Sequence, residues 1–285
     1  MTSESMKGKI CIVTGANSGI GKETAKQLAE LDAHVVMVVR NEEKGQKALI
    51  ETKEETKKDS LDLMICDFAS QKSIRNFVSE FMKKYKRLDV LVNNHGVMLP
   101  KKQLTENGLE STFAINYLGY FLLTNLLLEI IKSSSPSRIV NVSSGSFAAV
   151  RKIHLDDYNF DKRRYSLFKA YSESKLYINM FTYTLAERLK KANVTVTSFS
   201  PGYTRTNLGS TSLMMKITAK LSSFIADSSE KAAKHAIYLA TSPEIDGVTG
   251  KYFYRYKIKE PTRIASNKQL QEELWELSEK LTEAK

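Results

Sequence analysis

Residues 9–30 read KICIVTGANSGIGKETAKQLAE, and this stretch decides the fold class. The apolar run over 9–14 predicts a buried strand, and a glycine-rich turn leads from it directly into a helical segment over 19–31. The turn carries Gly15, Gly19 and Gly21 in the order G-x-x-x-G-x-G. Glycines allow a tight turn, and the N-terminus of the following helix presents free N–H groups to a pyrophosphate. The stretch therefore predicts a dinucleotide-binding loop, with an ordinary glycine-rich turn as the alternative.

The rest of the chain repeats this alternation of apolar runs and helical segments. Further strands are predicted at 34–39, 61–66, 88–93, 137–143, 194–200 and 251–256. Helices are predicted at 19–31, 41–57, 70–85, 107–133, 166–191 and 228–241. This order predicts an α/β, Rossmann-type fold, in which a doubly wound, seven-stranded parallel sheet is covered by helices on both faces.

The last apolar run differs from the others. Its tyrosines and Ile258 alternate with basic residues, namely Tyr252, Tyr254, Tyr256 and Ile258 against Arg255, Lys257 and Lys259. Lysines along one face are typical of an edge strand that is protected from pairing with another chain. A basic strip over 251–263 that touches a membrane is the alternative interpretation.

A single domain is expected over 1–285, because no linker rich in glycine, serine or proline divides the chain and 42% apolar residues suffice for a core. We expect the core over 8–255, a substrate lid over 207–226 and a C-terminal extension over 256–285. The extension ends in an amphipathic helix that could cap the domain or pair with another subunit. Its apolar positions are Leu270, Leu274, Trp275, Leu277 and Leu281.

The lid over 207–226 is expected from its apolar stripe. Leucines, isoleucines, methionines and a phenylalanine recur there at helical spacing, at Leu213, Met214, Met215, Ile217, Leu221, Phe224 and Ile225. Methionine provides an adaptable apolar surface, as lids over hydrophobic sites require. Core packing explains such a stripe equally well.

A cytoplasmic chain is expected, because no uncharged apolar stretch approaches ~18 residues and the first strand begins too early to leave room for a signal peptide. Cys11 and Cys66 fall in the first and third predicted strands, which a 3-2-1 strand order separates by an intervening strand. We expect two buried free thiols and no metal site.

The net charge of +11 does not indicate nucleic-acid binding. The lysines are scattered over predicted helix faces, and no nucleic-acid-binding signature accompanies them. A solvated lysine-rich surface is the simplest interpretation. An excess of basic residues is also compatible with binding of an anionic cofactor or with weak peripheral binding to an anionic membrane.

Cofactor choice is indicated at the end of the second strand. A site that binds the ribose hydroxyls of NAD usually has Asp or Glu about 20 residues beyond the loop. Here Arg40 stands at that point, with Lys44 one turn on and Lys22 beside the loop. A guanidinium matches a phosphate, so NADP(H) is favoured over NAD(H). Asp67, after the third strand, is expected to accept from the adenine amino group, with a turn residue as the alternative.

Tyr171 and Lys175 lie four residues apart in YSESK, so on a helix they share a face. A free tyrosine titrates near ~10, and a nearby cation favours the phenolate and lowers that pKa towards the working range. Ser144 precedes them by 27 residues (171 − 144) and offers a hydroxyl. These groups can move a proton onto a carbonyl oxygen while a hydride attacks its carbon.

With the glycine loop, Asp67, NNHG, Asn116, VSS, YSESK and PGYTRT in this order, the chain resembles the short-chain dehydrogenase/reductase superfamily over roughly residues 8–255. It is most similar to the retinol-dehydrogenase-like branch, through TGANSGIGKETA, VVRNEEKG, LTENGLESTFAINYLG and RIVNVSS. The resemblance implies that Tyr171 is the proton donor or acceptor and that Ser144 hydrogen-bonds the substrate oxygen. It also implies that Lys175 lowers the pKa of Tyr171 and that Asn116 holds a relay water.

The resemblance implies a set of cofactor-binding residues as well. They are Gly15, Asn17, Ser18, Gly19, Ile20, Gly21, Arg40, Lys44, Asp67, Phe68, Asn94, Gly96, Tyr171, Lys175, Pro201, Gly202, Thr204 and Thr206. The last four of these positions in the chain, 201–206, resemble the segment that closes over the nicotinamide.

Two departures from the family pattern stand out. His95 occupies the usual alanine position of N-N-A-G, where an imidazole must turn away from the cofactor or crowd its ribose; we expect a packed histidine. The connection between Ser144 and Tyr171 is long, and we interpret it as a loop that lines the substrate mouth. His154 within it is expected at the surface.

The leading functional hypothesis is an NADP(H)-dependent oxidoreductase that interconverts a lipophilic alcohol and its ketone or aldehyde, of the retinol or steroid type. The alternative is a catalytically silent scaffold or nucleotide sensor with the same fold. The resemblance implies a homo-oligomer, with 107–133 and 166–191 as the expected interface.

Overall fold

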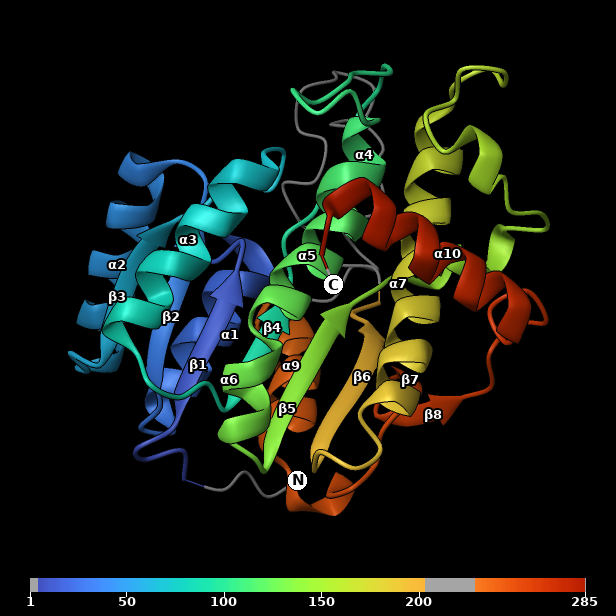
Figure 1. Ribbon diagram of the computed structural model, residues 1–285. Helices are drawn as coiled ribbons and strands as arrows, with labels where there is room; N and C mark the ends of the chain where they lie inside the picture. The colour runs from blue at the N-terminus through green and yellow to red at the C-terminus, as the bar shows by residue number, and fades with distance from the viewer. Residues whose placement is uncertain (1–4, 203–228, 285) are drawn as a thin grey trace.

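The computed structural model describes residues 5–202 and 229–284 (Figure 1). The predicted lid over 207–226, Thr204 and Thr206 lie outside the described residues. Within the described residues, eight strands form one sheet in the order β3-β2-β1-β4-β5-β6-β7-β8. Their bounds are β1 Ile10–Thr14, β2 His34–Val39, β3 Leu61–Ile65, β4 Val90–Asn93, β5 Ser137–Val142, β6 Val194–Ser200, β7 Lys251–Tyr254 and β8 Lys257–Lys259.

Helices cover both faces of this sheet (Figure 1). In the described part of the chain, those with eight or more residues are α1 Gly19–Glu30, α2 Glu42–Thr56, α3 Gln71–Lys84, α5 Gly119–Leu126, α7 Leu167–Arg188, α9 Ser229–Thr241 and α10 Lys268–Thr282. Shorter turns are α4 Ser111–Phe113, η1 Ala114–Leu118, α6 Leu128–Ser133, η2 Gly145–Ala149, η3 Leu155–Asp157 and η5 Pro243–Ile245. The predicted doubly wound α/β fold is confirmed.

The strand sequences divide the core into two layers. Along β1, Ile12 packs on the side of α3, α5 and α7, whereas Cys11 and Val13 pack on the side of α1, α2 and α9. In β2, Val36 and Val38 alternate with their neighbours in the same way. This follows from the two-residue period of a strand and explains why these runs are apolar throughout rather than alternating.

The prediction of seven strands was wrong by one. The last run does not continue through residue 256, because Arg255 and Tyr256 have φ values of 49° and 64° and reverse the chain. β8 then pairs antiparallel with β7 and becomes the sheet edge, with Lys257 and Lys259 exposed. A two-residue hairpin turn with positive φ at both positions is usually built from Asn and Gly. Neither residue type is present here, so the sequence carried no hairpin signal.

The single helix predicted over 107–133 is instead a broken one that begins at Ser111. Its second segment, η1, is a π-helical turn in which the Gly119 N–H bonds to the Ala114 carbonyl, five residues back. A π turn disturbs the regular ladder and is often found at functional sites. Asn116 lies within this turn.

The C-terminal helix caps the domain. α10 lies across α5 and α7, where Trp275 packs against Phe121 and Phe181 with ring centroids 5.0 and 5.8 Å away (Figure 1). Ser278 hydrogen-bonds the Tyr117 hydroxyl at 2.6 Å. The expected interface between subunits over 107–133 and 166–191 is therefore covered on this side by the chain's own helix. The sequence did not decide whether this helix would cap the domain or pair with another subunit. In the structure it packs on α5 and α7 of its own chain.

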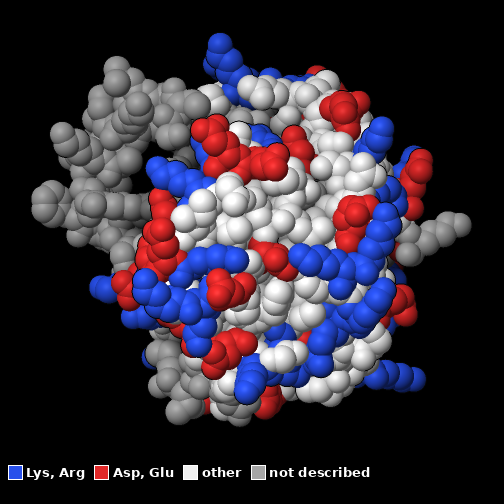
Figure 2. All heavy atoms as spheres, turned by 90° about the vertical axis from the view of Figure 1, so that its left-hand side faces the viewer, with Lys and Arg blue, Asp and Glu red and all other residues white. Residues whose placement is uncertain are grey.

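The two cysteines and the surface charges lie as expected. Cys11 on β1 and Cys66, directly after β3, are buried free thiols, and β2 separates the two strands. Burial raises the pKa of Cys66 to about 12. On the face at the β3 edge, Lys and Arg side chains are interspersed with Asp and Glu (Figure 2). Ion pairs such as Lys26 to Glu55 and Lys84 to Asp62 account for this mixing. In the described part of the chain, no helix is both long and apolar enough to cross a membrane.

Candidate active site

The strand order places the site at one edge of the sheet. β1 and β4 are neighbours, and the chain winds away from them in opposite directions. The carboxyl ends of parallel strands at such a switch point leave a crevice in which ligands bind. Thr14 and Asn94 stand at these strand ends, and the Asn94 N–H donates to the Thr14 hydroxyl at 2.8 Å.

The glycine loop at this edge has the shape that a pyrophosphate needs. Gly15 and Gly19 have φ values of 67° and 56°, which glycine adopts without strain. A Cβ added at Gly21 would lie 2.4 Å from the Gly15 carbonyl oxygen, so the turn closes only with glycine there. Ser18 precedes α1 with no side-chain cap bond, so no side chain of the N-cap residue takes up the N–H groups of the first turn. These groups form a fitting cradle for an anion.

Asn94 ties this loop to the neighbouring strand. Its side-chain amide donates to the carbonyl oxygens of Thr14 at 2.8 Å and Gly15 at 3.5 Å. The loop and the end of β4 therefore form one hydrogen-bonded unit. Asn17 and Ser18 lie in the same loop, and Ile20 is buried in the first turn of α1.

The basic residues near the loop do not behave alike. Arg40 and Lys44 are exposed beyond the end of β2. Neither forms an ion pair with any residue that the structure describes. Lys22 is instead engaged with Glu51, 2.5 Å away. Arg40 and Lys44 can therefore receive a phosphate, whereas Lys22 would have to leave its partner.

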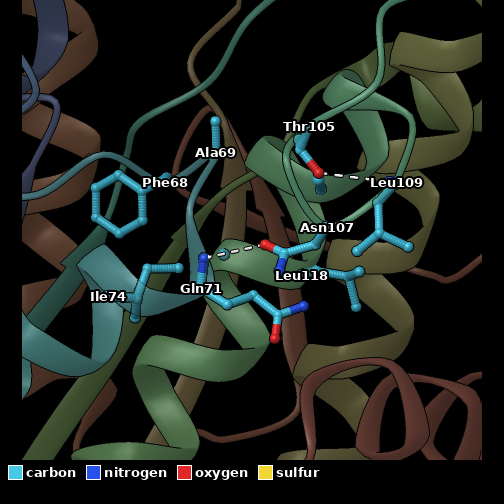
Figure 3. Close-up of a pocket in the computed structure, with 10 residues that line it drawn as sticks. Phe68, Ala69, Gln71, Ile74, Thr105, Asn107, Leu109 and Leu118 are labelled. Carbon is cyan, nitrogen blue, oxygen red and sulfur yellow. Dashed lines mark hydrogen bonds between the residues drawn. The ribbon is translucent and has the colours of Figure 1, made fainter.

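Asp67 and Phe68 follow β3. One Asp67 carboxylate oxygen accepts from the Ala69 N–H at 3.0 Å, so the alternative role as a turn residue is realised. The Phe68 ring is buried rather than turned to the crevice, and it lines a small cavity with Ile74 and Leu118 (Figure 3). That cavity has a volume of about 10 Å³, room for about one water molecule and not for a substrate.

The catalytic candidates meet at the ends of β5 and α7. The Lys175 ammonium nitrogen lies 5.5 Å from the centre of the Tyr171 ring and donates to the Val142 carbonyl at 2.9 Å. Ser144, two residues further along, hydrogen-bonds the Tyr171 phenol. Ser143 donates to the Lys175 carbonyl at 3.1 Å and so joins the strand end to the helix. The structure thus brings together the three groups predicted from the sequence.

The electrostatics of this pair differ from the expectation. Burial raises the pKa of Tyr171 above its usual value, and the hydrogen bond from Ser144 only partly opposes this. Burial also lowers the pKa of Lys175 to about 7. The net shift of the Tyr171 pKa is therefore upward, opposite to the predicted direction, because removal from water disfavours both charged forms. The role of Lys175 in lowering that pKa stays a prediction. Tyr171 is accordingly a protonated phenol at neutral pH, suited to donate a proton.

Asn116 connects the crevice to the catalytic helix. Its side chain accepts from the Val97 N–H at 2.7 Å and donates to the Val97 carbonyl at 3.0 Å and to the Ser174 hydroxyl at 3.1 Å. Ser174 in turn donates to the Tyr171 carbonyl at 2.7 Å. A Cβ at Gly96 would lie 3.4 Å from Asn116 Oδ1 and 3.8 Å from Lys175 Nζ. Gly96 thus keeps the space beside both residues open.

The segment after β6 lies beside Ser144 and the turn that follows it. Ser200 accepts from the Gly145 N–H at 3.1 Å and from the Gly202 N–H at 3.4 Å. It therefore holds the turn that follows Ser144 against Pro201 and Gly202, which the sequence placed near the nicotinamide. The rest of that predicted clamp lies outside the described residues.

The long connection between Ser144 and Tyr171 is held by a buried charge cluster that the sequence did not reveal. The Arg163 guanidinium bonds Asp157 at 2.8 Å and Glu173 at 2.7 Å, and the two carboxylates are only 3% and 8% exposed. Glu173 stands between Tyr171 and Lys175 on α7. A local sequence pattern does not show that a charged residue is buried. The one signal for burial of Glu173 was its position within YSESK, between two candidate catalytic residues. His154, expected at the surface, is half-buried.

His95 turns away from the crevice and packs, as the sequence favoured. Its ring stacks on Phe68 at 3.4 Å between centroids and meets the edge of Tyr120 at 4.7 Å. Its nitrogens lie 2.9 Å from the Thr14 hydroxyl and 2.9 Å from the Ile115 carbonyl oxygen. Burial, with a smaller effect of the Lys175 charge, holds the pKa of His95 well below its usual value. The ring is therefore neutral.

The sheet, the glycine cradle and the Ser-Tyr-Lys group together define a nicotinamide-dependent oxidoreductase. The family model for the short chain dehydrogenase matches residues 9–216. The chain therefore belongs to the short-chain dehydrogenase family, within its retinol-dehydrogenase-like branch.

The relatives that show this branch cover nearly the whole chain. Human retinol dehydrogenase 13 is 40% identical over 280 residues, which cover 96% of this chain and 84% of that protein. Human polyprenol dehydrogenase is 38% identical over 285 residues, covering 96% and 85%. The crystal structure of an uncharacterised protein from Mycobacterium paratuberculosis is 32% identical with a TM-score of 0.81, covering 99% of this chain and 96% of that one.

Proposed function

We propose that this oxidoreductase uses NADP(H) and interconverts a lipophilic alcohol and its aldehyde or ketone, with Tyr171 as the acid/base group. The observation that carries the proposal is the placement of Tyr171 and Lys175 on one face of α7, next to Ser144. Two relatives, retinol dehydrogenase 13 and polyprenol dehydrogenase, are named for lipophilic alcohols, which supports this substrate class.

The chemistry follows from the positions of these groups. When bound, the reduced nicotinamide supplies a hydride to the carbonyl carbon. Ser144 donates a hydrogen bond to the carbonyl oxygen, and Tyr171 donates its phenolic proton to that oxygen as negative charge develops on it. Lys175 lies close enough to stabilise the resulting phenolate, and a lysine with a pKa of about 7 can exchange its proton near neutral pH.

The proposed preference for NADP(H) rests on Arg40. Its guanidinium is exposed just beyond β2, and a planar fork of donors suits a 2′-phosphate better than a ribose hydroxyl. Lys44 is a second cation one turn further along the chain, and the cofactor role of Asp67 would use its second carboxylate oxygen.

The test is reduction of a panel of carbonyl compounds, including retinal, a steroid ketone, a quinone and a short aldehyde. Tyr171→Phe should keep NADPH binding and lose nearly all turnover, with Tyr165→Phe as the matched control on the neighbouring connection. Undiminished turnover in Tyr171→Phe would exclude the assigned chemistry and favour the alternative, a silent scaffold. Arg40→Ser should weaken NADPH binding and leave NADH binding unchanged; preference of the wild type for NADH would contradict the cofactor assignment.

We further propose that the chain acts as one domain, in the cytoplasm or loosely attached to a membrane surface, and self-associates. Because α10 covers α5 and α7, self-association would use another surface than the one expected. Light scattering measures the assembly. Co-sedimentation with anionic vesicles across a salt series measures membrane attachment, which should weaken as salt rises if the exposed lysines of β8 carry it.

A further inference from the structure

The π turn that contains Asn116 leaves one carbonyl without its ordinary partner. In a regular helix the Gly119 N–H would bond to Ile115, four residues back. Here it bonds to Ala114 instead, so the Ile115 carbonyl is released. A buried carbonyl without a donor is costly, and it needs a partner from elsewhere in the fold.

His95 supplies that partner. Its Nε2 lies 2.9 Å from the Ile115 oxygen, and a carbonyl can only accept, so Nε2 carries the proton of the neutral ring. Nδ1 is then an acceptor, and the Thr14 hydroxyl, 2.9 Å away, is its donor in preference to the more distant Val92 carbonyl at 3.3 Å. The tautomer is therefore fixed by its two partners.

The surroundings are shaped to hold the ring at this point. A Cβ at Gly119 would lie 3.0 Å from His95 Nε2 and 3.3 Å from Phe68, so the absence of a side chain at Gly119 leaves the room that His95 uses. Phe68 stacks on one face of the ring and Tyr120 meets it edge-on. The Tyr120 hydroxyl also donates to the His95 carbonyl at 2.9 Å, which fixes the backbone of the same residue.

We propose that His95 is a positioning residue for the reaction, which holds the π turn open through the Ile115 carbonyl so that Asn116 reaches both Val97 and Ser174. The residue following Ile115 is Asn116, whose amide must face two parts of the fold at once: Val97 in the segment after β4, and Ser174 on the catalytic helix. If the turn relaxed to a regular helix, the Gly119 N–H would take the Ile115 carbonyl. The face on which Asn116 stands would then rotate relative to α7. His95 replaces the alanine that is usual at this position, and alanine could not provide the bond.

Three substitutions at one position separate the contacts. His95→Gln places an amide N–H near Nε2 and keeps the donor to Ile115. His95→Asn places its amide near Nδ1 and keeps only a partner for Thr14. His95→Phe keeps a ring against Phe68 and neither bond. If His95 only filled space, the His95→Phe variant should be closer to wild type than His95→Gln. The proposal expects the His95→Gln variant to be the closest to wild type.

The first measurement is hydrogen–deuterium exchange of the amides over 114–120, which does not depend on turnover. Exchange should be close to wild type in His95→Gln, and faster by about tenfold in His95→Asn and His95→Phe, the factor that one lost hydrogen bond corresponds to. Equal protection in all four proteins, or a Gln variant that exchanges like Phe, would overturn the proposal.

The second measurement rests on the proposed function and uses NADPH with retinal. The kcat of His95→Asn should fall by about tenfold, again the scale of one hydrogen bond, while its KM for NADPH stays near the wild-type value because the Thr14 contact is kept. His95→Gln should recover most of kcat. If kcat is the same in all variants, His95 only packs. If the wild type itself turns over no carbonyl compound, the proposed function fails, and the exchange measurement alone decides the role of His95.

Discussion

Acid should destabilise this protein through His95 before its carboxylates are protonated. The perturbation is a pH change from 7.5 to 5.5 in the wild type and in His95→Gln. In the folded state the pKa of His95 is held well below its usual value of 6.5, mainly by burial. The unfolded chain releases the ring to water, where it titrates near ~6.5. Protons therefore bind preferentially to the unfolded state.

The magnitude follows from linkage. A group whose folded pKa is depressed contributes a loss of stability that grows as pH falls below the unfolded pKa. At pH 5.5 the unfolded ring is about nine-tenths protonated. A folded ring that stays neutral at this pH lowers the free energy of unfolding by up to about 1.4 kcal/mol through this residue. At pH 7.5 the same contribution is below about 0.1 kcal/mol.

The assay is urea denaturation of both proteins at pH 7.5, 6.5 and 5.5. The wild type should lose more stability than His95→Gln between the two extremes, by up to about 1.4 kcal/mol. His95→Phe is the control: it is less stable at pH 7.5 because it lacks both hydrogen bonds, yet it should show the same flattened pH dependence as Gln. Parallel curves for wild type and both variants would refute the buried, neutral state of the ring.

Three further predictions concern the framework of the site. Arg163→Met leaves Asp157 and Glu173 buried without a cation and should cost about 3–5 kcal/mol of unfolding free energy in urea. Lys190→Met, which breaks an exposed pair with Glu187, should cost less than about 1 kcal/mol, and equal effects would contradict the burial argument. Trp275→Ala should cost about 3–5 kcal/mol in thermal or urea unfolding by emptying the contact between α10 and α7, whereas Glu276→Ala on the exposed face should be nearly neutral. Gly21→Ala should abolish NADPH binding in a fluorescence titration, because its Cβ would meet the Gly15 carbonyl; Gly145→Ala, with no atom closer than 4.0 Å, should bind normally.

Much of the fold was legible from local patterns. The parallel strands and the helices over them were predicted within a few residues, because each apolar run or helical period is a property of neighbouring residues. The glycine loop and the pair Tyr171 and Lys175 were equally visible, since their chemistry needs fixed spacing along the chain. The hairpin that makes β8 was missed because its turn residues carry no common signal.

What the tertiary structure alone decided involves contacts between distant segments. The covering of α5 and α7 by α10, the burial of Asp157 and Glu173 around Arg163, and the direction of the Tyr171 pKa all depend on which surfaces lose water. The sequence marked His95 as a departure and expected it to pack. Only the fold showed that the ring meets the carbonyl that the π turn releases. Spacing fixes which groups can act together, whereas burial and hydrogen bonding, which require the whole chain, set their charge and their orientation.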